Sequence, residues 1–348
     1  MDEIRVGVIG HFGNGKNLLN GQTIKTKIIT EGLKEKLGEK EVICVDTHGG
    51  LKKLPKIFFE IYGITKKCKN IIMFPAHNGI LFIAPTMLIW GRIFDRKLHY
   101  VVIGGWLAQF LQKHRMLKRI LLKFDGIYVE TTTMKKNMEE LGFSNVIVIP
   151  NCKKLDILNE KELSCSVSKP YKLCTFSRVI KEKGIEDAIK CIYEINTKNE
   201  KIIYELDIFG QIGVEYKKRF LELQSKFPQY IKYCGEIPFS ESVKIIKEYD
   251  LLLFPTRFYT EGIPGTIIDA YASGVPVLAS KWENYSDIID DEMTGIGYEF
   301  ENVLDFKEKL YYLMTHSEKI VNMKKNCLKK AELFTVDFNM KKFIEFLE

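Results

Sequence analysis

Short hydrophobic runs alternate along the chain with longer segments in which hydrophobic residues recur at helical spacing. This alternation predicts parallel sheets covered by helices, because a helix returns the chain between neighbouring parallel strands. Strands are predicted in the first half at Ile4–Ile9, Glu41–Val45, Asn70–Phe74, Leu98–Ile103, Gly126–Val129 and Val146–Ile149. Helices are predicted there at Thr23–Leu37, Leu107–Phe124 and Thr132–Leu141.

A polar stretch over residues 151–170 interrupts this pattern, and its many Lys, Glu and Ser residues are typical of a connector. After it the pattern starts again, with strands predicted at Lys172–Phe176, Tyr204–Phe209, Ile231–Tyr233, Leu251–Phe254, Val277–Ala279 and Gly297–Glu299. We therefore expect an α/β protein with two parallel-sheet domains, residues 1–150 and 171–335. A last helix over residues 336–348 is expected to pack back towards the first domain.

The length of 348 residues supports two domains, because it exceeds what one ordinary hydrophobic core organises. Eight cysteines are scattered without a C-x-x-C pair and no secretory signal is found, so we expect reduced thiols in a cytoplasmic protein. The apolar run Ile71–Phe94 is interrupted by Pro75, His77 and Pro85. These breaks favour a buried strand followed by a buried helix over a membrane span.

The net charge of +7 is unevenly placed along the chain. Residues 51–124 contain fourteen bases and two acids, Glu60 and Asp95, so this region has a charge of +12 and the remainder −5. An anionic partner suits such a region, and a membrane is favoured over nucleic acid because no nucleic-acid motif accompanies the charge. Residues 113–123 predict a basic amphipathic helix, which either lies on an anionic leaflet on the inner face of the cell membrane or is an ordinary surface helix. Its apolar side consists of Met116, Leu117, Ile120 and Leu121.

A loop in the second half joins a predicted strand, which ends at Phe176, to a helix. It contains Arg178, Lys183 and Gly184. Ligands of open α/β sheets bind at this edge, where an arginine fork and a lysine point charge suit a diphosphate. A solvated turn is the simpler explanation of any single Lys–Arg pair.

A second loop follows the strand Leu251–Phe254 and contains two acids, Glu261 and Asp269. Its glycines let backbone amides approach a ligand, and a helix that begins near Pro264 would direct its positive end at phosphate oxygens. We expect the two acids to bind separate hydroxyls, one of a sugar and one of a ribose. The residues between them that are expected at the site are Gly262, Ile263, Pro264, Gly265 and Thr266.

Taken in order, these loops resemble those of glycosyltransferase family 4, a group of retaining enzymes with the GT-B architecture of two Rossmann-like domains facing across a cleft. The resemblance covers essentially the whole chain. Its motifs are an arginine followed by a lysine and a glycine, and two acids with seven residues between them. Weaker matches are Gly210 with Gly213, Gly235 with Pro238, and Pro150 with Asn151.

The resemblance implies that Arg178 and Lys183 hold the pyrophosphate of a nucleotide sugar, with a UDP-sugar as the expected donor. It also implies that Glu261 contacts the donor sugar and that Asp269 binds the ribose, although the family usually has glutamate at the last position. The two cations and the helix-start amides would stabilise the charge that develops on the leaving diphosphate. No Asp-x-Asp triplet is present for a metal ion, so we expect no metal and no other cofactor.

The segment Gly10–Asn17 nearly matches a P-loop, which makes a nucleotide hydrolase an alternative. Asn17 replaces the Ser or Thr that would hold magnesium, and Asn20 with Gly21 delays the helix. In the family interpretation this loop lies across the cleft and closes over the donor phosphates or the acceptor, because glycines permit close backbone approach. The residues expected there are Gly13, Gly15, Gly21, Gln22 and Thr23.

The acceptor side departs from the family, which often has a histidine after the strand predicted at Leu98–Ile103, where this chain has Gly104, Gly105 and Trp106. His77 is a candidate substitute with a structural role equally open, and Trp106 either stacks on a sugar or fills the core. We expect a hexosyltransferase that adds a sugar to a saccharide acceptor, undecaprenyl-linked, in bacterial capsule, exopolysaccharide or O-antigen synthesis. A catalytically inactive GT-B protein that binds a saccharide or a partner enzyme is the other alternative.

Overall fold

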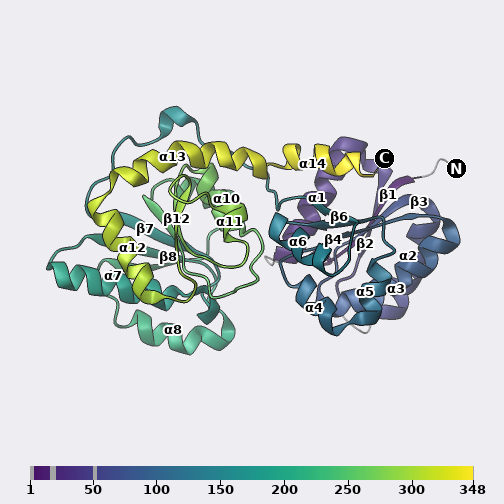
Figure 1. The fold of residues 1–348 in the computed structure, drawn as a ribbon, viewed down its shortest axis with the longest axis horizontal. Coiled ribbons are helices and arrows are strands. Elements are labelled where there is room, and N and C mark those ends of the chain that lie inside the picture. Colours follow the sequence, from purple (N-terminus) through teal and green to yellow (C-terminus); the bar gives the residue numbers. More distant parts are fainter. Residues whose placement is uncertain (1–3, 16–20, 50–52, 348) are drawn as a thin grey trace. The chain divides into compact units, whose positions relative to one another are not determined.

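The computed structural model describes residues 4–15, 21–49 and 53–347, and in it the chain forms two compact units. Unit 1 consists of residues 1–154 and 334–348, and unit 2 of residues 155–333. Each unit contains one six-stranded parallel sheet covered by helices (Figure 1). The predicted α/β class is therefore confirmed.

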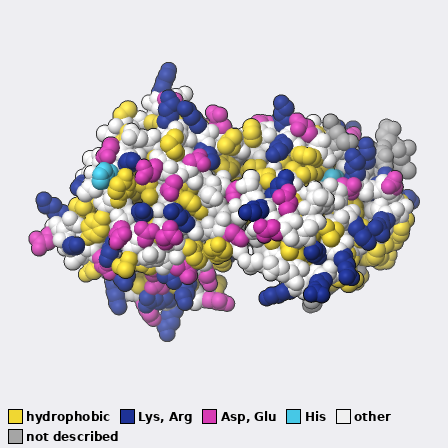
Figure 2. Space-filling view, viewed as in Figure 1, with side chains coloured by type: hydrophobic (Ala, Val, Ile, Leu, Met, Phe, Trp, Pro, Cys, Tyr) yellow, Lys and Arg dark blue, Asp and Glu magenta, His cyan; other side chains and the backbone are white. Residues whose placement is uncertain are grey.

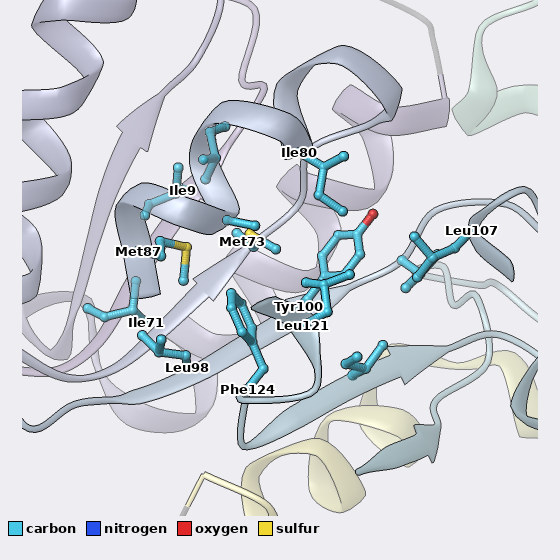
Figure 3. Packing of buried hydrophobic residues seen from close by; sticks show 14 of the residues in the cluster. Ile9, Ile71, Met73, Ile80, Met87, Leu98, Tyr100, Leu107, Leu121 and Phe124 are labelled. Carbon is cyan, nitrogen blue, oxygen red and sulfur yellow. The ribbon is translucent and has the colours of Figure 1, made fainter. Parts of the chain in front are cut away.

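The strands of unit 1 are arranged in the order β2-β1-β3-β4-β5-β6, and all pair in parallel. They are β1 Ile4–Gly10, β2 Val42–Asp46, β3 Cys68–Met73, β4 Lys97–Val101, β5 Gly126–Val129 and β6 Val146–Val148. The helices are α1 Gly21–Leu37, α2 Leu54–Lys67, α3 His77–Phe94, α4 Leu107–Lys113, α5 Arg115–Leu121, α6 Thr132–Glu140 and α14 Val336–Glu345. Because helices cover the sheet, β5 is buried along its whole length. Figure 3 shows Ile71 and Leu98 of the sheet pointing towards Met87 of α3.

Helix α14 completes the core of unit 1 beside α1. A Cβ at Gly32 of α1 would lie 2.7 Å from Met340, so the glycine allows this close approach. The carbonyl of Leu347 accepts a hydrogen bond of 3.0 Å from Asn70, whose Oδ1 in turn accepts one of 3.1 Å from Nε2 of His99. Burial lowers the pKa of His99 to about 3, so the ring stays neutral and its Nδ1 accepts from the Tyr128 hydroxyl.

The predicted helix Leu107–Phe124 is wrong, because α4 and α5 are separate helices that break at His114, where φ is −123° and ψ is 65°. The His114 ring stacks on Phe110 at 3.9 Å and its Nδ1 bonds the Phe110 carbonyl at 2.8 Å. This contact lies at the junction, where the regular helical path of the backbone is interrupted.

The apolar side predicted for residues 113–123 is largely used inside unit 1. Leu117 and Leu121 are buried and Ile120 packs against the same core, whereas Met116 is exposed. Most of the apolar side of this stretch is therefore that of an ordinary surface helix, which leaves its bases and the exposed Met116 and Leu122 for a membrane. Within the described residues, no helix is both long and apolar enough to cross a bilayer.

Unit 2 has the strand order β12-β11-β10-β7-β8-β9, again in parallel. The strands are β7 Tyr171–Phe176, β8 Tyr204–Phe209, β9 Ile231–Gly235, β10 Leu251–Phe254, β11 Val277–Ser280 and β12 Gly295–Tyr298. The helices are α7 Ile185–Asn199, α8 Lys217–Gln224, α9 Ser242–Ile246, α10 Gly265–Ala272, α11 Tyr285–Ile288, α12 Val303–Thr315 and α13 Glu318–Ala331. All twelve predicted strands lie within two residues of the observed bounds.

Candidate functional site

The strand order of unit 2 reverses between β7 and β10, since β8 and β9 continue on one side and β11 and β12 on the other. Open parallel sheets bind ligands at the carboxyl ends of the strands that flank such a reversal. The loop after β7 holds Arg178 and Lys183, and the loop after β10 holds Glu261. Three of the four side chains predicted to bind the donor therefore lie on the two loops that flank this point, and Asp269 lies in α10.

Two glycines let the loops of unit 2 approach closely. Gly184 has a φ of 65°, and a Cβ there would lie 1.9 Å from the carbonyl oxygen of Pro255 after β10. Gly210 after β8 has a φ of 130°, and a Cβ there would lie 1.8 Å from the carbonyl oxygen of Ser177 after β7. Side chains are excluded at both positions, so the three loops pack backbone against backbone.

Replacing Gly210 by alanine is expected to lower the free energy of unfolding by more than about 2 kcal/mol, because it adds a backbone clash to an unfavourable φ. Gly235 is the matched control, since its φ is 80° and a Cβ added there would meet no atom within 4 Å. Gly235→Ala should cost about 1 kcal/mol from the φ angle alone. Urea unfolding compares the two variants, and equal losses would contradict the close approach.

An ion pair joins the two loops. Nζ of Lys183 lies 2.5 Å from Oε2 of Glu261, and the side chains are only 10% and 21% exposed. The Thr256 hydroxyl donates to the same oxygen at 3.2 Å. The ammonium also lies 5.2 Å from the centre of the Phe254 ring and 5.3 Å from that of Phe258. Lys183 is therefore held in one place by a carboxylate and two aromatic rings.

The backbone of Glu261 is fixed from the other side. Its carbonyl accepts hydrogen bonds from Nε1 of Trp282 at 3.1 Å and from Nδ2 of Asn284 at 2.7 Å. Both donors follow β11, the next strand of the sheet. The position of the carboxylate is thus set by three loops.

Arg178 differs from Lys183 in its surroundings. Its side chain is exposed, and among the described residues its guanidinium makes no hydrogen bond or ion pair. The loop after β7 therefore offers the exposed cation of Arg178 beside the held cation of Lys183. Such a combination suits a ligand with two or more negative groups.

The first turn of α10 adds polar groups without charge. Pro264 precedes the helix, and Gly265 and Thr266 supply its first backbone N–H groups, which have no acceptor within a helix. Oγ1 of Thr266 is buried and has no hydrogen-bond partner among the residues that the structure describes. Together with the helix dipole, these donors favour an anionic oxygen. Gly262 and Ile263 are buried directly before this turn.

Asp269 lies in a different setting from the one a ribose contact suggests. The side chain is buried in α10, and its Oδ2 accepts a hydrogen bond of 2.9 Å from Ser242 of α9. Gly235 and Pro238 build the connection that brings α9 there. Gly235 accepts from the Gly210 amide at 2.8 Å, and Pro238 precedes the short turn that leads into α9.

The sequence did not suggest a further cation, Arg257. Its guanidinium forms three contacts of 2.9 to 3.0 Å with the carboxylate of Asp187 in α7, and its amide donates to Glu182 at 2.8 Å. Burial disfavours its charge, but the hydrogen bonds to Asp187 outweigh this and raise the pKa of Arg257. This pair joins residues 70 positions apart, so no local motif predicts it.

In unit 1 the strand order reverses between β1 and β3. The loop after β1 turns through Gly13 and Gly15, whose φ angles are 84° and 80°. The carboxylate of Asp46, at the end of β2, accepts from the amides of Phe12 at 2.9 Å and Asn14 at 2.6 Å. Burial alone would raise the pKa of Asp46, but these amides and that of His48 outweigh it and lower the pKa.

These contacts bear on the P-loop alternative. A P-loop presents its amides to phosphate, whereas here a carboxylate already accepts two of them. Lys16, Asn17 and Asn20 lie outside the described residues. The described part of the loop therefore argues against a nucleotide hydrolase.

The start of α1 is tied to neighbouring strands. Nε2 of Gln22 donates to the carbonyl of Phe74 at 3.1 Å, and Oγ1 of the buried Thr23 lies 2.7 Å from Nδ1 of His11. Gly21 is the first residue of the helix, and a Cβ added there would meet no described atom within 4 Å. Gln22 and Thr23 thus position the helix start beside the glycine loop.

His77 and Trp106, both predicted on the acceptor side, are brought together in unit 1. Their rings stack with centroids 3.8 Å apart, and Nε1 of Trp106 donates to the carbonyl of Ile103 at 2.8 Å. The partial burial of its ring lowers the pKa of His77. The pair therefore presents a neutral aromatic surface at the carboxyl edge of the sheet.

Residues 156–330, half of the chain, match the family described as glycosyl transferases group 1. The chain belongs to this family. The matched segment contains all the loops of unit 2 that meet at the reversal of strand order. In this glycosyltransferase family member, the Lys183–Glu261 pair and Arg178 thus lie within the family domain.

Relatives of this glycosyltransferase family member are distant. An uncharacterized glycosyltransferase of Methanocaldococcus jannaschii is 23% identical over 241 residues, which are 66% of this chain and 59% of that protein. The amylovoran biosynthesis glycosyltransferase AmsK of Erwinia amylovora is 24% identical over 138 residues, 38% of this chain and 33% of that protein. The chain thus spans less than two thirds of the length of these relatives.

The fold is also found in solved structures. The crystal structure of Anabaena HepE in complex with UDP superimposes with a TM-score of 0.76 over 98% of both chains, at 13% identity. This similarity confirms the GT-B class of fold.

Proposed function

We propose that the protein is a retaining glycosyltransferase that moves a sugar from a nucleoside-diphosphate donor, in particular a UDP-sugar, to a saccharide acceptor. The observation that supports this most strongly is the set of donors at the strand reversal of unit 2. These donors are Lys183, which is paired with Glu261, the free Arg178, and the first backbone N–H groups of α10, which no side chain caps. The UDP complex of HepE shows that a protein of this fold binds such a nucleotide.

Each group has a role in the proposed reaction. The two cations and the α10 amides bind the diphosphate and stabilise the charge that develops as the sugar leaves. Glu261 binds a hydroxyl of the donor sugar, and its contact with Lys183 adjusts when the diphosphate arrives. Asp269 is proposed to bind the ribose, as the resemblance implies, while Ser242 holds its Oδ2.

The acceptor is proposed to bind at unit 1, where the glycine loop and the His77–Trp106 stack lie at the carboxyl edge of the sheet. The name of the Erwinia amylovora relative supports a role in synthesis of a surface polysaccharide. A lipid-linked saccharide in the cytoplasm is the proposed acceptor, and bases of residues 113–123 contribute charge towards an anionic membrane.

Release of nucleoside diphosphate from UDP-, GDP- and ADP-sugars, together with the thermal shift that each produces, tests the proposal. We expect the largest shift and the fastest release with a UDP-sugar. Turnover should persist in EDTA, because protein cations supply the charge stabilisation. Loss of turnover in EDTA that added Mg²⁺ or Mn²⁺ restores would contradict the metal-independent mechanism. Absence of binding to every nucleotide sugar would favour an inactive binding protein instead.

A further inference from the structure

Helix α3 is hydrophobic on the side that faces solvent as well as on the side that faces the core. Ile80, Ile83 and Met87 pack inside unit 1. On the outer side, Leu81, Ile89 and Ile93 are 45%, 53% and 61% exposed. Residues four or eight positions apart lie on one face of a helix, so these three form a stripe. A helix that is apolar all round normally has a partner on every side.

Helix α2 widens this stripe with aromatic residues. Phe59 is 70% exposed and Tyr62 is 36% exposed. The Tyr62 ring contacts Trp90 of α3 at 4.9 Å and Phe94 at 5.6 Å between centroids. We call the five exposed apolar residues of these two packed helices the α2–α3 surface: Phe59, Tyr62, Leu81, Ile89 and Ile93. Exposed apolar side chains that gather on neighbouring elements mark interaction sites.

Basic residues accompany the α2–α3 surface. Glu60 is the one acid within α2 and α3, and it pairs with Lys56 at 3.5 Å. The exposed bases on the same two helices are Lys56, Lys66, Lys67 and Arg92. At the right of Figure 2, hydrophobic side chains (yellow) and basic side chains (dark blue) gather where Figure 1 places α2 and α3. The occupant of this surface must therefore be apolar and anionic at once.

We propose that the α2–α3 surface binds the face of an anionic lipid bilayer. Isoleucine and phenylalanine side chains enter the boundary of the acyl chains, tyrosine stays at the headgroup level, and the bases meet lipid phosphates. Pairing of two copies through this surface is disfavoured, because a twofold interface would place one basic rim against the other. The inference does not rest on the proposed transfer reaction.

Co-sedimentation with vesicles tests the proposal, using phosphatidylcholine alone and phosphatidylcholine mixed with phosphatidylglycerol. The protein is expected to bind the mixed vesicles and not the neutral ones. Ile89→Glu with Ile93→Glu should reduce binding at least about tenfold, because two apolar side chains that enter the bilayer become charged. Lys66→Glu with Arg92→Glu should also reduce binding and weaken its dependence on salt.

Leu304→Glu is the matched control, because this leucine is 67% exposed in unit 2 and should leave binding unchanged. Arg115→Glu with Arg119→Glu measures the contribution of α5 to vesicle binding. This variant should reduce binding less than the isoleucine variant of the α2–α3 surface. Circular dichroism shows whether each variant is folded. The thermal shift with UDP shows whether its nucleotide site still binds, so loss of nucleotide binding is distinguished from loss of vesicle binding. Undiminished binding of the isoleucine variant, or equal loss in the Leu304 control, overturns the proposal. It is also overturned if the protein fails to bind vesicles but forms a dimer that the isoleucine changes dissociate.

Discussion

Lys183→Ala is expected to lower kcat/KM for sugar transfer by roughly 10²–10³-fold, because the ammonium is a preorganised charge where the diphosphate leaves. Its 2.5 Å contact with Glu261 holds it in place before any ligand arrives. Lys183→Arg should recover part of the loss, since the charge remains while the geometry changes. Initial rates of nucleoside diphosphate release measure both variants.

Glu261→Ala tests whether the two residues act as a unit. The double variant, Lys183→Ala with Glu261→Ala, should have a kcat/KM only slightly below that of the less active single variant, because removing either residue already disturbs the other. Lys307→Ala is the control, as it breaks a partly exposed pair with Glu194, 2.8 Å apart, in the same unit. Full turnover in both site variants would refute the donor assignment.

Glu130→Ala is expected to lower the stability of unit 1 by about 3–5 kcal/mol, because it leaves the buried ammonium of Lys25 without a counter-charge. The two side chains are 2.5 Å apart and both are buried. In this variant the ammonium of Lys25 would keep its hydrogen bond of 3.1 Å to the carbonyl of Val102. Urea unfolding followed by circular dichroism measures the change.

Two further proteins complete this measurement. Lys25→Met with Glu130→Leu should be more stable than either single truncation, because no buried charge is left unpaired. Lys154→Ala removes an exposed pair with Glu35 and should change stability by less than about 1 kcal/mol. If Glu130→Ala were as mild as Lys154→Ala, the buried pair would not be needed for stability.

Most of the fold followed from the hydrophobic pattern, because buried parallel strands such as Leu251–Phe254 are continuous apolar runs. The helix break at His114 did not. The residues on either side have good helical spacing, and the break coincides with a hydrogen bond between the His114 ring and the Phe110 carbonyl. The apolar face of α3 was also missed, because a run of apolar residues does not show which side neighbours will cover.

At the site, the sequence identified residues through their place after strands. It therefore predicted Arg178, Lys183 and Glu261 as site residues, but not the ion pair between Lys183 and Glu261, which are 78 positions apart. The setting of Asp269 depends on Ser242 of another helix, α9, so its burial was not foreseeable from the spacing of the two acids. The Arg257–Asp187 clamp is a similar long-range contact. These roles follow from tertiary packing rather than from local pattern.

The contribution of α14 to unit 1 has a consequence for synthesis on the ribosome. Residues 155–333 form unit 2 and are translated before residues 334–347, which supply Met340, Phe343 and the Leu347 carbonyl to unit 1. Unit 2 can therefore complete its core first, although unit 1 begins to emerge earlier. Until residues 334–347 have been translated, the side of α1 at Gly32 and the ring of Tyr128 remain uncovered, so the nascent first unit exposes apolar surface during the whole synthesis of unit 2.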